Sequence, residues 1–254
     1  LYRGERELCF LPLAHAYSCA FNFLVPMAVG AHVYLLGKVP SPKILLKAFE
    51  EVKPNLILTV PLILEKIYKK MILPQLSKTT MKVALNIPLL DSRIYAQIRK
   101  KLVDAFGGRF REVIVGGAAM NEEVTNFLYK IKFPFTIGYG MTECGPLISY
   151  DHNDEYVPGS CGQILKGIMK VRIDSEDPYN KVGEIQVSGE NVMKGYYKNE
   201  EATSKVFTED GWLRTGDLGT IDADNRIYIR GRSKTMILGA SGQNIYPEEI
   251  EDKL

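Results

Sequence analysis

Apolar residues follow two different periods along the first part of the chain. Ile44, Leu45 and Phe49 recur at the three- and four-residue spacing of one helix face. Between such segments lie short runs that are almost wholly apolar, at 56–60, 112–115 and 133–137. Strands without polar alternation are covered on both faces, as in parallel sheets between helices. The pattern predicts an α/β fold with a doubly wound, mostly parallel sheet.

Capping residues mark where the predicted helices begin. Ser41 followed by Pro42 is typical of a helix start, with serine as N-cap and proline in the first turn. Asn121 followed by Glu122 and Glu123 indicates a second start, because acids are favoured at the positive end of the helix dipole. Helices are therefore expected over about 41–53, 61–72 and 92–106, and from 121 onward.

A run without Asp, Glu, Lys or Arg extends from Leu8 to Gly37. By length it exceeds the roughly 20 residues of a membrane helix. Proline, glycine and histidine residues divide it, so we expect a strand, a buried helix and a second strand at 31–36 rather than a transmembrane segment. His15 lies in this run, and its apolar surroundings favour a satisfied core residue over a ligand.

Beyond about residue 150 the strands become shorter and alternate with polar residues. An Asp- and Asn-rich turn at 222–226 predicts a β-hairpin, and the charged stretch 231–234 is interpreted as a flexible linker. We therefore predict three parts: an α/β nucleotide- and acyl-binding subdomain at 1–150, a β-rich subdomain at 151–230, and at 231–254 a hinge with the beginning of a small, truncated C-terminal α+β domain.

Composition narrows the class of protein. Of the 254 residues 46% are hydrophobic, and 32 Lys and Arg against 30 Asp and Glu give a net charge of +2 without a long run of one sign. This charge predicts no nucleic-acid partner. The four cysteines stand far apart without a C-x-x-C pair, which argues against disulfides and zinc and favours a reducing, cytoplasmic setting. Nothing in the sequence indicates an oligomeric state.

The loop after the predicted strand 133–137 carries groups suited to a nucleotide. Carboxyl ends of parallel strands are where α/β proteins bind ligands. Gly138 and Gly140 would allow close backbone approach, while Tyr139 could lie against a base. Thr142 could donate to a phosphate oxygen and Glu143 could hold Mg²⁺, which prefers oxygen ligands. The alternative is a tight turn with an exposed acid.

Two further loops carry weaker signals. Gly116, Gly117 and Ala118 follow the preceding strand, and their small size would leave room for a flat ring. Asp217 comes after a glycine turn in the loop 212–217, and a carboxylate can accept hydrogen bonds from both hydroxyls of a ribose. Taken singly, an ordinary βα turn and an aspartate that satisfies a turn are the alternatives.

Together these segments resemble the adenylate-forming superfamily, which includes acyl-CoA synthetases, acyl and aryl acid ligases, luciferases and peptide-synthetase adenylation domains. The similar stretches are GGAAM at 116–120, GYGMTE at 138–143, GEIQVSGENVMKGYY at 183–197, LRTGDL at 213–218, and GRSK with SGQNIYPEEIE between 231 and 251. LPLAHAY at 11–17 resembles the family's histidine-bearing segment beside the acyl site. Among subfamilies the chain is most similar to bacterial long-chain fatty acid-CoA ligases.

The resemblance implies a role for each matching residue. Tyr139 would stack on adenine, Thr142 would contact the α-phosphate and Glu143 would bind Mg²⁺. The remaining expected roles are adenine and acyl pocket borders at Gly116, Gly117 and Ala118, nucleotide contacts at Gly138 and Gly140, ribose contacts at Asp217 and Arg232, the domain hinge at Lys234, and a wall or gate of the acyl site at His15.

The reaction implied by the resemblance has two steps. A carboxylate, most simply of a fatty acid, attacks the α-phosphorus of ATP with Mg²⁺ present, giving acyl-adenylate and pyrophosphate. The thiol of CoA, the cosubstrate, then displaces AMP. Transfer to a carrier-protein thiol and a non-catalytic nucleotide-binding module remain alternatives. A fatty-acid substrate would suit a peripheral position at a membrane surface, although no amphipathic basic helix is evident in the sequence.

Three departures from the family pattern bear on activity. The chain has no initiator methionine and ends in a helix just begun, so we expect it to be a piece of a longer protein. The family's phosphate loop would lie before Leu1, and its adenylation lysine would lie after Leu254. Thr235 stands where many relatives carry an acid. We therefore expect the longer protein to be a ligase, and this chain alone to bind nucleotide weakly at best and to be inactive.

Overall fold

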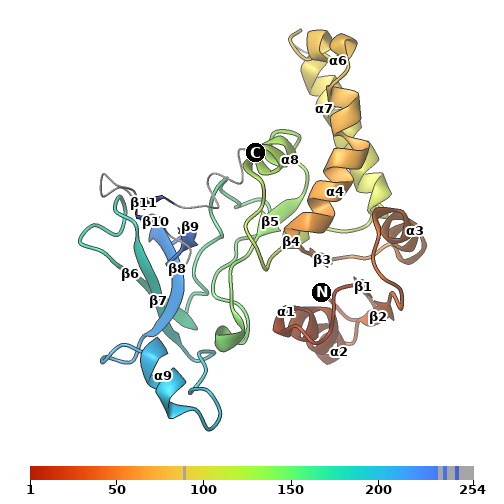
Figure 1. Cartoon of the computed structure of the whole chain (residues 1–254). Helices are drawn as coiled ribbons and strands as arrows, with labels where there is room; N and C mark the ends of the chain where they lie inside the picture. Colours follow the sequence, from red (N-terminus) through yellow and green to blue (C-terminus); the bar gives the residue numbers. More distant parts are fainter. Residues whose placement is uncertain (88–89, 234–236, 239–243, 246–254) are drawn as a thin grey trace. The chain divides into compact units, whose positions relative to one another are not determined.

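A computed structural model describes residues 1–87, 90–233, 237–238 and 244–245 of the chain (Figure 1). The chain divides into two compact units. Unit 1 comprises Leu1–Thr136 and His152–Asp154, and unit 2 comprises Ile137–Asp151 and Glu155–Leu254.

Unit 1 alternates strands and helices, as the apolar pattern predicts. Its strands are β1 (Arg6–Cys9), β2 (His32–Leu35), β3 (Ile57–Thr59), β4 (Val113–Val115) and β5 (Phe135–Ile137), whose last residue begins unit 2. Its helices are α1 (Ala16–Ser18), the π-helix η1 (Cys19–Leu24), α2 (Val25–Val29), α3 (Pro42–Val52), α4 (Pro61–Met71), α5 (Leu73–Leu76), α6 (Thr79–Ala84), α7 (Leu90–Ala105) and α8 (Glu122–Lys130). β1 pairs with β2 and β3 pairs with β4, both in parallel, and β5 completes the order β3-β4-β5. The α/β fold class is confirmed.

The predicted caps are confirmed as hydrogen bonds. The Ser41 hydroxyl accepts from the Ile44 amide at 3.4 Å, and the Asn121 side chain accepts from the Val124 amide at 3.2 Å. Each cap satisfies an amide that the helix itself leaves unpaired. Local sequence signals therefore set these helix starts.

The uncharged run 8–37 folds as the predicted strand, helical segment and second strand. In the part of the chain that the structure describes, no helix is long and apolar enough to cross a membrane. The prediction of a core histidine is wrong, because His15 is exposed. It is the N-cap residue of α1 with an extended backbone, so its side chain lies at the entry to the helix instead of on the buried face.

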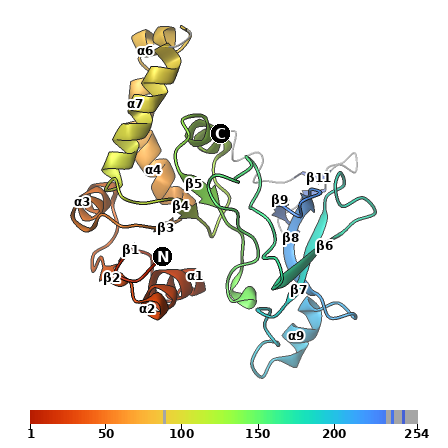
Figure 2. The ribbon, with the colours of Figure 1, turned by 180° about the vertical axis from the view of Figure 1, so that it is seen from behind.

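Unit 2 is built on an antiparallel sheet, seen from the other side in Figure 2. The sheet has the order β6 (Met169–Asp174), β7 (Gly183–Gly189), β8 (Leu213–Ile221) and β9 (Ile227–Arg232). The remaining described elements are the 3-10 helix η2 (Thr142–Cys144), α9 (Glu200–Val206), and the antiparallel pair β10 (Ile237–Leu238) and β11 (Asn244–Ile245). Ile148, Ile185 and Ile227 are fully buried in its core.

One predicted linker is partly a strand. Gly231 and Arg232 are the last residues of β9, opposite Leu218 and Asp217 of β8. Main-chain pairing to β8 therefore orders them, despite the local composition of glycine and charge that is typical of a loop. The rest of the proposed hinge, including Lys234, lies outside the described residues.

Candidate nucleotide site

The segment after β5 turns back tightly on itself. The amide of Tyr139 donates to the carbonyl of Ser149 at 3.0 Å, and the amide of Ile148 donates to the carbonyl of Tyr139 at 2.9 Å. Between them, a Cβ at Gly140 would lie only 1.8 Å from the carbonyl oxygen of Pro146. Gly140 is thus required by this close backbone approach, independently of any nucleotide.

Tyr139 and Asp217 are joined directly. The Tyr139 hydroxyl donates to Oδ2 of Asp217 at 2.6 Å, although 78 positions separate the two residues. Burial, followed by the charge of Asp217, raises the pKa of Tyr139 well above its usual value. Tyr139 therefore stays a neutral donor that fixes the carboxylate. Its ring is only 7% exposed, so a stacking role on adenine remains a prediction.

Arg232 holds the other oxygen of the same carboxylate. Asp217 faces Arg232 in the β8–β9 register, and Nε of Arg232 lies 3.2 Å from Oδ1 of Asp217. The arginine side chain is 71% exposed, whereas that of Asp217 is 12% exposed. The structure thus brings three predicted site residues together as Tyr139, Asp217 and Arg232. This cluster offers a carboxylate next to exposed guanidinium donors, a set that suits ribose hydroxyls.

Asp217 lies in a strand and not in the predicted loop. Gly216 has a φ of 74°, which explains its turn-like signal, but it belongs to β8. The register of β7 against β8 shifts at this point, as in a β-bulge. Thr215, which the sequence analysis did not single out, fixes the bulge: its hydroxyl donates to the carbonyl of Ile185 at 2.7 Å and accepts from the amide of Asp217 at 3.1 Å.

Glu143 is held on η2 from a distant segment. The hydroxyl of Tyr196 donates to Oε1 of Glu143 at 2.9 Å, and the amide of Met193 donates to the Glu143 carbonyl at 2.7 Å. The hydrogen bond to Glu143 raises the pKa of Tyr196, which keeps this hydroxyl protonated. The second carboxylate oxygen has no hydrogen-bond partner among the described residues. A half-buried carboxylate with one available oxygen fits a Mg²⁺ ligand.

Asn191 supports the same helix from below. Its side-chain amide donates to the carbonyls of Cys144 at 2.6 Å and Leu147 at 2.7 Å. Asn191 therefore ties the end of η2 to the following turn. Neither Asn191 nor Tyr196 could be recognised from spacing, because both contacts span about fifty residues along the chain.

We expect Asn191→Leu to lower the free energy of unfolding of unit 2 by about 2 kcal/mol, because two carbonyls lose their donor. The measurement is urea unfolding followed by the fluorescence of Trp212, the single tryptophan of the chain. Asn180→Leu, at an exposed turn position of the same unit, is the matched control and should change stability by less than about 0.5 kcal/mol. Equal effects of the two variants would contradict a supporting role for Asn191.

In unit 1 the structure joins two of the predicted motifs. The Tyr17 hydroxyl, from LPLAHAY, donates to the carbonyl of Ile114 at 3.2 Å. A Cβ at Gly116 would lie 3.3 Å from the Tyr17 ring, so the ring leaves room there only for glycine. Gly117 has a φ of 90°, and both Gly117 and Ala118 are exposed. Tyr17 is a residue that the sequence analysis passed over.

The predicted site residues therefore form two groups. His15, Gly116, Gly117 and Ala118 belong to unit 1. Gly138, Tyr139, Gly140, Thr142, Glu143, Asp217 and Arg232 belong to unit 2, where Thr142 is exposed on η2.

Comparisons with known proteins agree with this site. The chain is 30% identical to the long-chain-fatty-acid–CoA ligase FadD15 of Mycobacterium bovis, covering 100% of this chain and 44% of that protein. It is 31% identical to 4-coumarate-CoA ligase 1 of Narcissus pseudonarcissus, with 97% and 42% covered. Among solved structures, O-succinylbenzoate coenzyme A synthetase (MenE) of Bacillus subtilis in complex with ATP and magnesium is 26% identical with a TM-score of 0.71, covering 97% of this chain and 45% of that one.

The chain thus spans less than half the length of the relatives it matches. The family model described as AMP-binding enzyme matches residues 2–197, which include most of the motifs on which the resemblance rests. The resemblance inferred from those motifs is confirmed, and the chain belongs to the AMP-binding enzyme family.

Proposed function

We propose that this chain forms part of an ATP-dependent acid–CoA ligase, which makes acyl-adenylate and pyrophosphate and then passes the acyl group to CoA. The observation that carries the proposal is the Tyr139–Asp217–Arg232 cluster, with its carboxylate bonded on both oxygens. Glu143 on η2 in the same unit supplies a carboxylate oxygen suited to Mg²⁺. Relatives named as acid–CoA ligases support the same reaction class.

Each residue in the cluster has a defined role in this proposal. Asp217 and Arg232 would hold the ribose hydroxyls, and Tyr139 keeps Asp217 in position while lying against the base. Glu143 would hold Mg²⁺, which neutralises phosphate charge when bound. Thr142, exposed on η2, would donate to the α-phosphate. Catalysis would come mainly from positioning and charge stabilisation, because adenylation needs no covalent step on the protein.

We propose a long-chain fatty acid as the substrate. FadD15 of Mycobacterium bovis supports this choice at 30% identity. An aryl acid is the second candidate, because 4-coumarate-CoA ligase 1 is 31% identical. The identities are too close to rank the two substrates, so the experiment must include both.

The test is acid-dependent exchange of labelled pyrophosphate into ATP by the complete reading frame that contains this chain. Acids from acetate to palmitate, with 4-coumarate, would be compared. We expect exchange with long-chain acids, and a fall of about 100-fold for Glu143→Gln, because a charged metal ligand is lost. For the 254-residue chain alone we expect no exchange.

Glu155→Gln is the matched control, because Glu155 is an exposed acid of the same unit outside the cluster. It should leave exchange unchanged. Exchange with 4-coumarate and not with fatty acids would replace the substrate, and acyl-adenylate without thioester formation on added CoA would favour a carrier-protein acceptor. Absence of exchange with every acid would overturn the ligase proposal in favour of a nucleotide-binding module.

A further inference from the structure

Positive charge is concentrated in one segment of unit 1. Residues 66–101 contain nine lysines and arginines and a single acid, Asp91, whereas the whole chain has a net charge of +2. The segment alone carries +8, so the rest of the chain is net negative. The cations are spaced along the sequence without a continuous run, and only the fold shows how they gather.

On α4 the cations occupy one face. Lys66, Lys69 and Lys70 stand three and four positions apart and are exposed. Ile67 and Tyr68, between them in the sequence, are buried on the opposite face. Contrary to the sequence-based expectation, α4 is thus an amphipathic basic helix.

On α7 the arrangement is the same. Arg93 and Lys100 are seven positions apart, or about two turns, and both are exposed. Ile98 and Leu102 are the buried residues of this helix. The basic face of α7 therefore also points away from the core.

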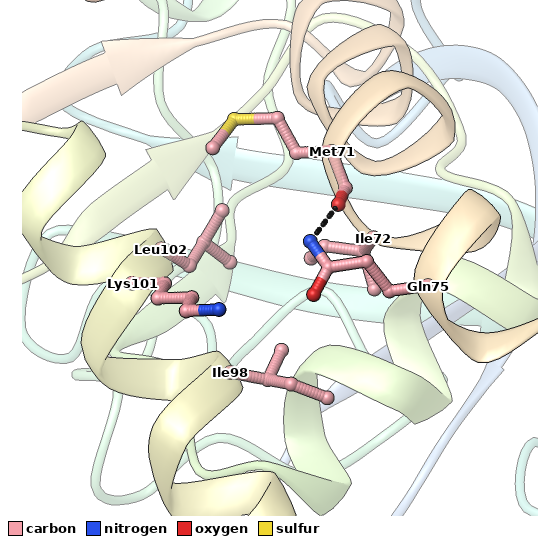
Figure 3. Close-up of a pocket in the computed structure, with 6 residues that line it drawn as sticks. All are labelled: Met71, Ile72, Gln75, Ile98, Lys101 and Leu102. Atoms are coloured by element: carbon pink, nitrogen blue, oxygen red, sulfur yellow. Dashed lines mark hydrogen bonds between the residues drawn. The ribbon is translucent and has the colours of Figure 1, made fainter. Parts of the chain in front are cut away.

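α4 and α7 pack against each other as a pair. Figures 1 and 2 both show the two helices side by side, with α6 at the end of the pair. The ends of α4 and α5 meet α7 across a small, mainly apolar pocket of about 40 Å³. Figure 3 shows its lining, with Met71, Ile72 and Gln75 on one side and Ile98, Lys101 and Leu102 on the other. A pocket of this size holds at most one or two water molecules, so the inner faces are used for packing and the basic faces remain outside.

The end of this helix pair is apolar and exposed. Val83 and Ile87 are 59% and 48% exposed, and Leu73 and Leu90 are also exposed. Lys78 is an exposed cation in the same part of the chain. We call residues 69–87 and 90–93 the hairpin tip. It combines exposed aliphatic side chains with Lys69, Lys70, Lys78 and Arg93.

We propose that the hairpin tip binds an anionic lipid surface. Its cations match the negative potential of phospholipid headgroups, and its aliphatic side chains can enter the boundary between headgroups and acyl chains. Among the described residues, none of the exposed cations on α4 or α7 has a salt-bridge partner, so their charge is available to a partner. The opposite net charge of the rest of the chain would orient the molecule with the tip toward the membrane.

Exposed aliphatic side chains distinguish this surface from one that binds only by charge. A nucleic acid would be matched by the cations, but it would gain nothing from Val83, Ile87, Leu73 and Leu90. The proposal does not depend on the ligase reaction, because membrane binding is measured without substrate.

The test is co-sedimentation of the 254-residue chain with vesicles of phosphatidylcholine alone or mixed with phosphatidylglycerol. We expect binding only to the mixed vesicles, and its loss at about 1 M salt, where charges are screened beyond about 3 Å. Lys69→Glu, Lys70→Glu, Lys78→Glu and Arg93→Glu together should weaken binding at least about 100-fold, since each basic residue contributes about 1 kcal/mol at such a surface.

The matched control reverses four exposed lysines elsewhere: Lys38→Glu, Lys43→Glu, Lys166→Glu and Lys170→Glu. It changes the net charge equally and should retain most of the binding. Val83→Ser with Ile87→Ser tests the apolar contribution and should weaken binding about 10-fold. Equal loss in both charge variants, equal binding to neutral vesicles, or binding to single-stranded DNA without binding to vesicles would overturn the proposal.

Discussion

Arg226→Met is expected to lower the free energy of unfolding of unit 2 by about 3 kcal/mol, because it leaves a buried aspartate without its cation. Nε of Arg226 donates to Oδ2 of Asp151 at 2.9 Å, and Asp151 is 3% exposed. The same guanidinium donates to Asp224 at 2.7 Å, within the turn that joins β8 to β9. Arg226 therefore ties the β8–β9 hairpin to the segment that follows the Tyr139 turn.

Fluorescence of Trp212, which lies in unit 2, would follow this loss during urea unfolding. Arg214→Met is the control, since Arg214 pairs with Glu184 at 2.9 Å but its side chain is 42% exposed. An exposed pair contributes about 0–1 kcal/mol. Adding Asp151→Asn to Arg226→Met should recover part of the stability, because the unpaired charge is removed. A double variant as unstable as the sum of the single variants would contradict this explanation.

Much of the fold could be predicted because its signals are local. Ser41 and Asn121 act as caps within their own first turns, and the buried strands β3 and β4 are short apolar runs. α9 was missed because its seven residues bury no side chain and so show no apolar period. Its start nevertheless carried the same signal as α8, since Asn199 caps the amide of Ala202.

The site was predicted by residue but not by arrangement. Motif spacing indicated Tyr139 and Asp217, yet their hydrogen bond depends on how two distant strands are registered. Asp217 was assigned to a loop because Gly216 carries a turn-like signal, whereas main-chain pairing keeps it in β8. Tyr196 and Asn191, which hold η2, are defined only by contacts between distant segments.

A buried charge in unit 1 is a further feature that the apolar pattern could not reveal. Glu7 lies in β1 between charged Arg6 and apolar Leu8, yet it is fully buried. Oε1 accepts a hydrogen bond from Asn22 at 2.6 Å, and Asn22 accepts one from Ser18 at 3.1 Å. The other oxygen, Oε2, has no hydrogen-bond partner. Burial with so few donors raises the pKa of Glu7 to about 8.

The stability of unit 1 is therefore expected to fall as pH rises. Between pH 4.5, the ordinary pKa of the group, and about 8, folded Glu7 keeps a proton that the unfolded chain has released. Because the native state binds more protons, each unit of pH in this window removes up to about 1.4 kcal/mol. From about pH 5 to about pH 7.5 the expected loss is about 3 kcal/mol.

Glu7→Gln should abolish this pH dependence, because glutamine keeps the acceptor for Asn22 and cannot ionise. The variant should match the wild type near pH 5 and exceed it by about 3 kcal/mol near pH 7.5. Far-UV circular dichroism during urea unfolding is the appropriate probe, since helices α1 to α8 all lie in unit 1. Glu50→Gln, at an exposed position of α3, should retain the wild-type dependence. A slope that survives in Glu7→Gln would show that another group carries it. A slope lost only in that variant would identify the proton of Glu7 as the condition for packing β1 against η1.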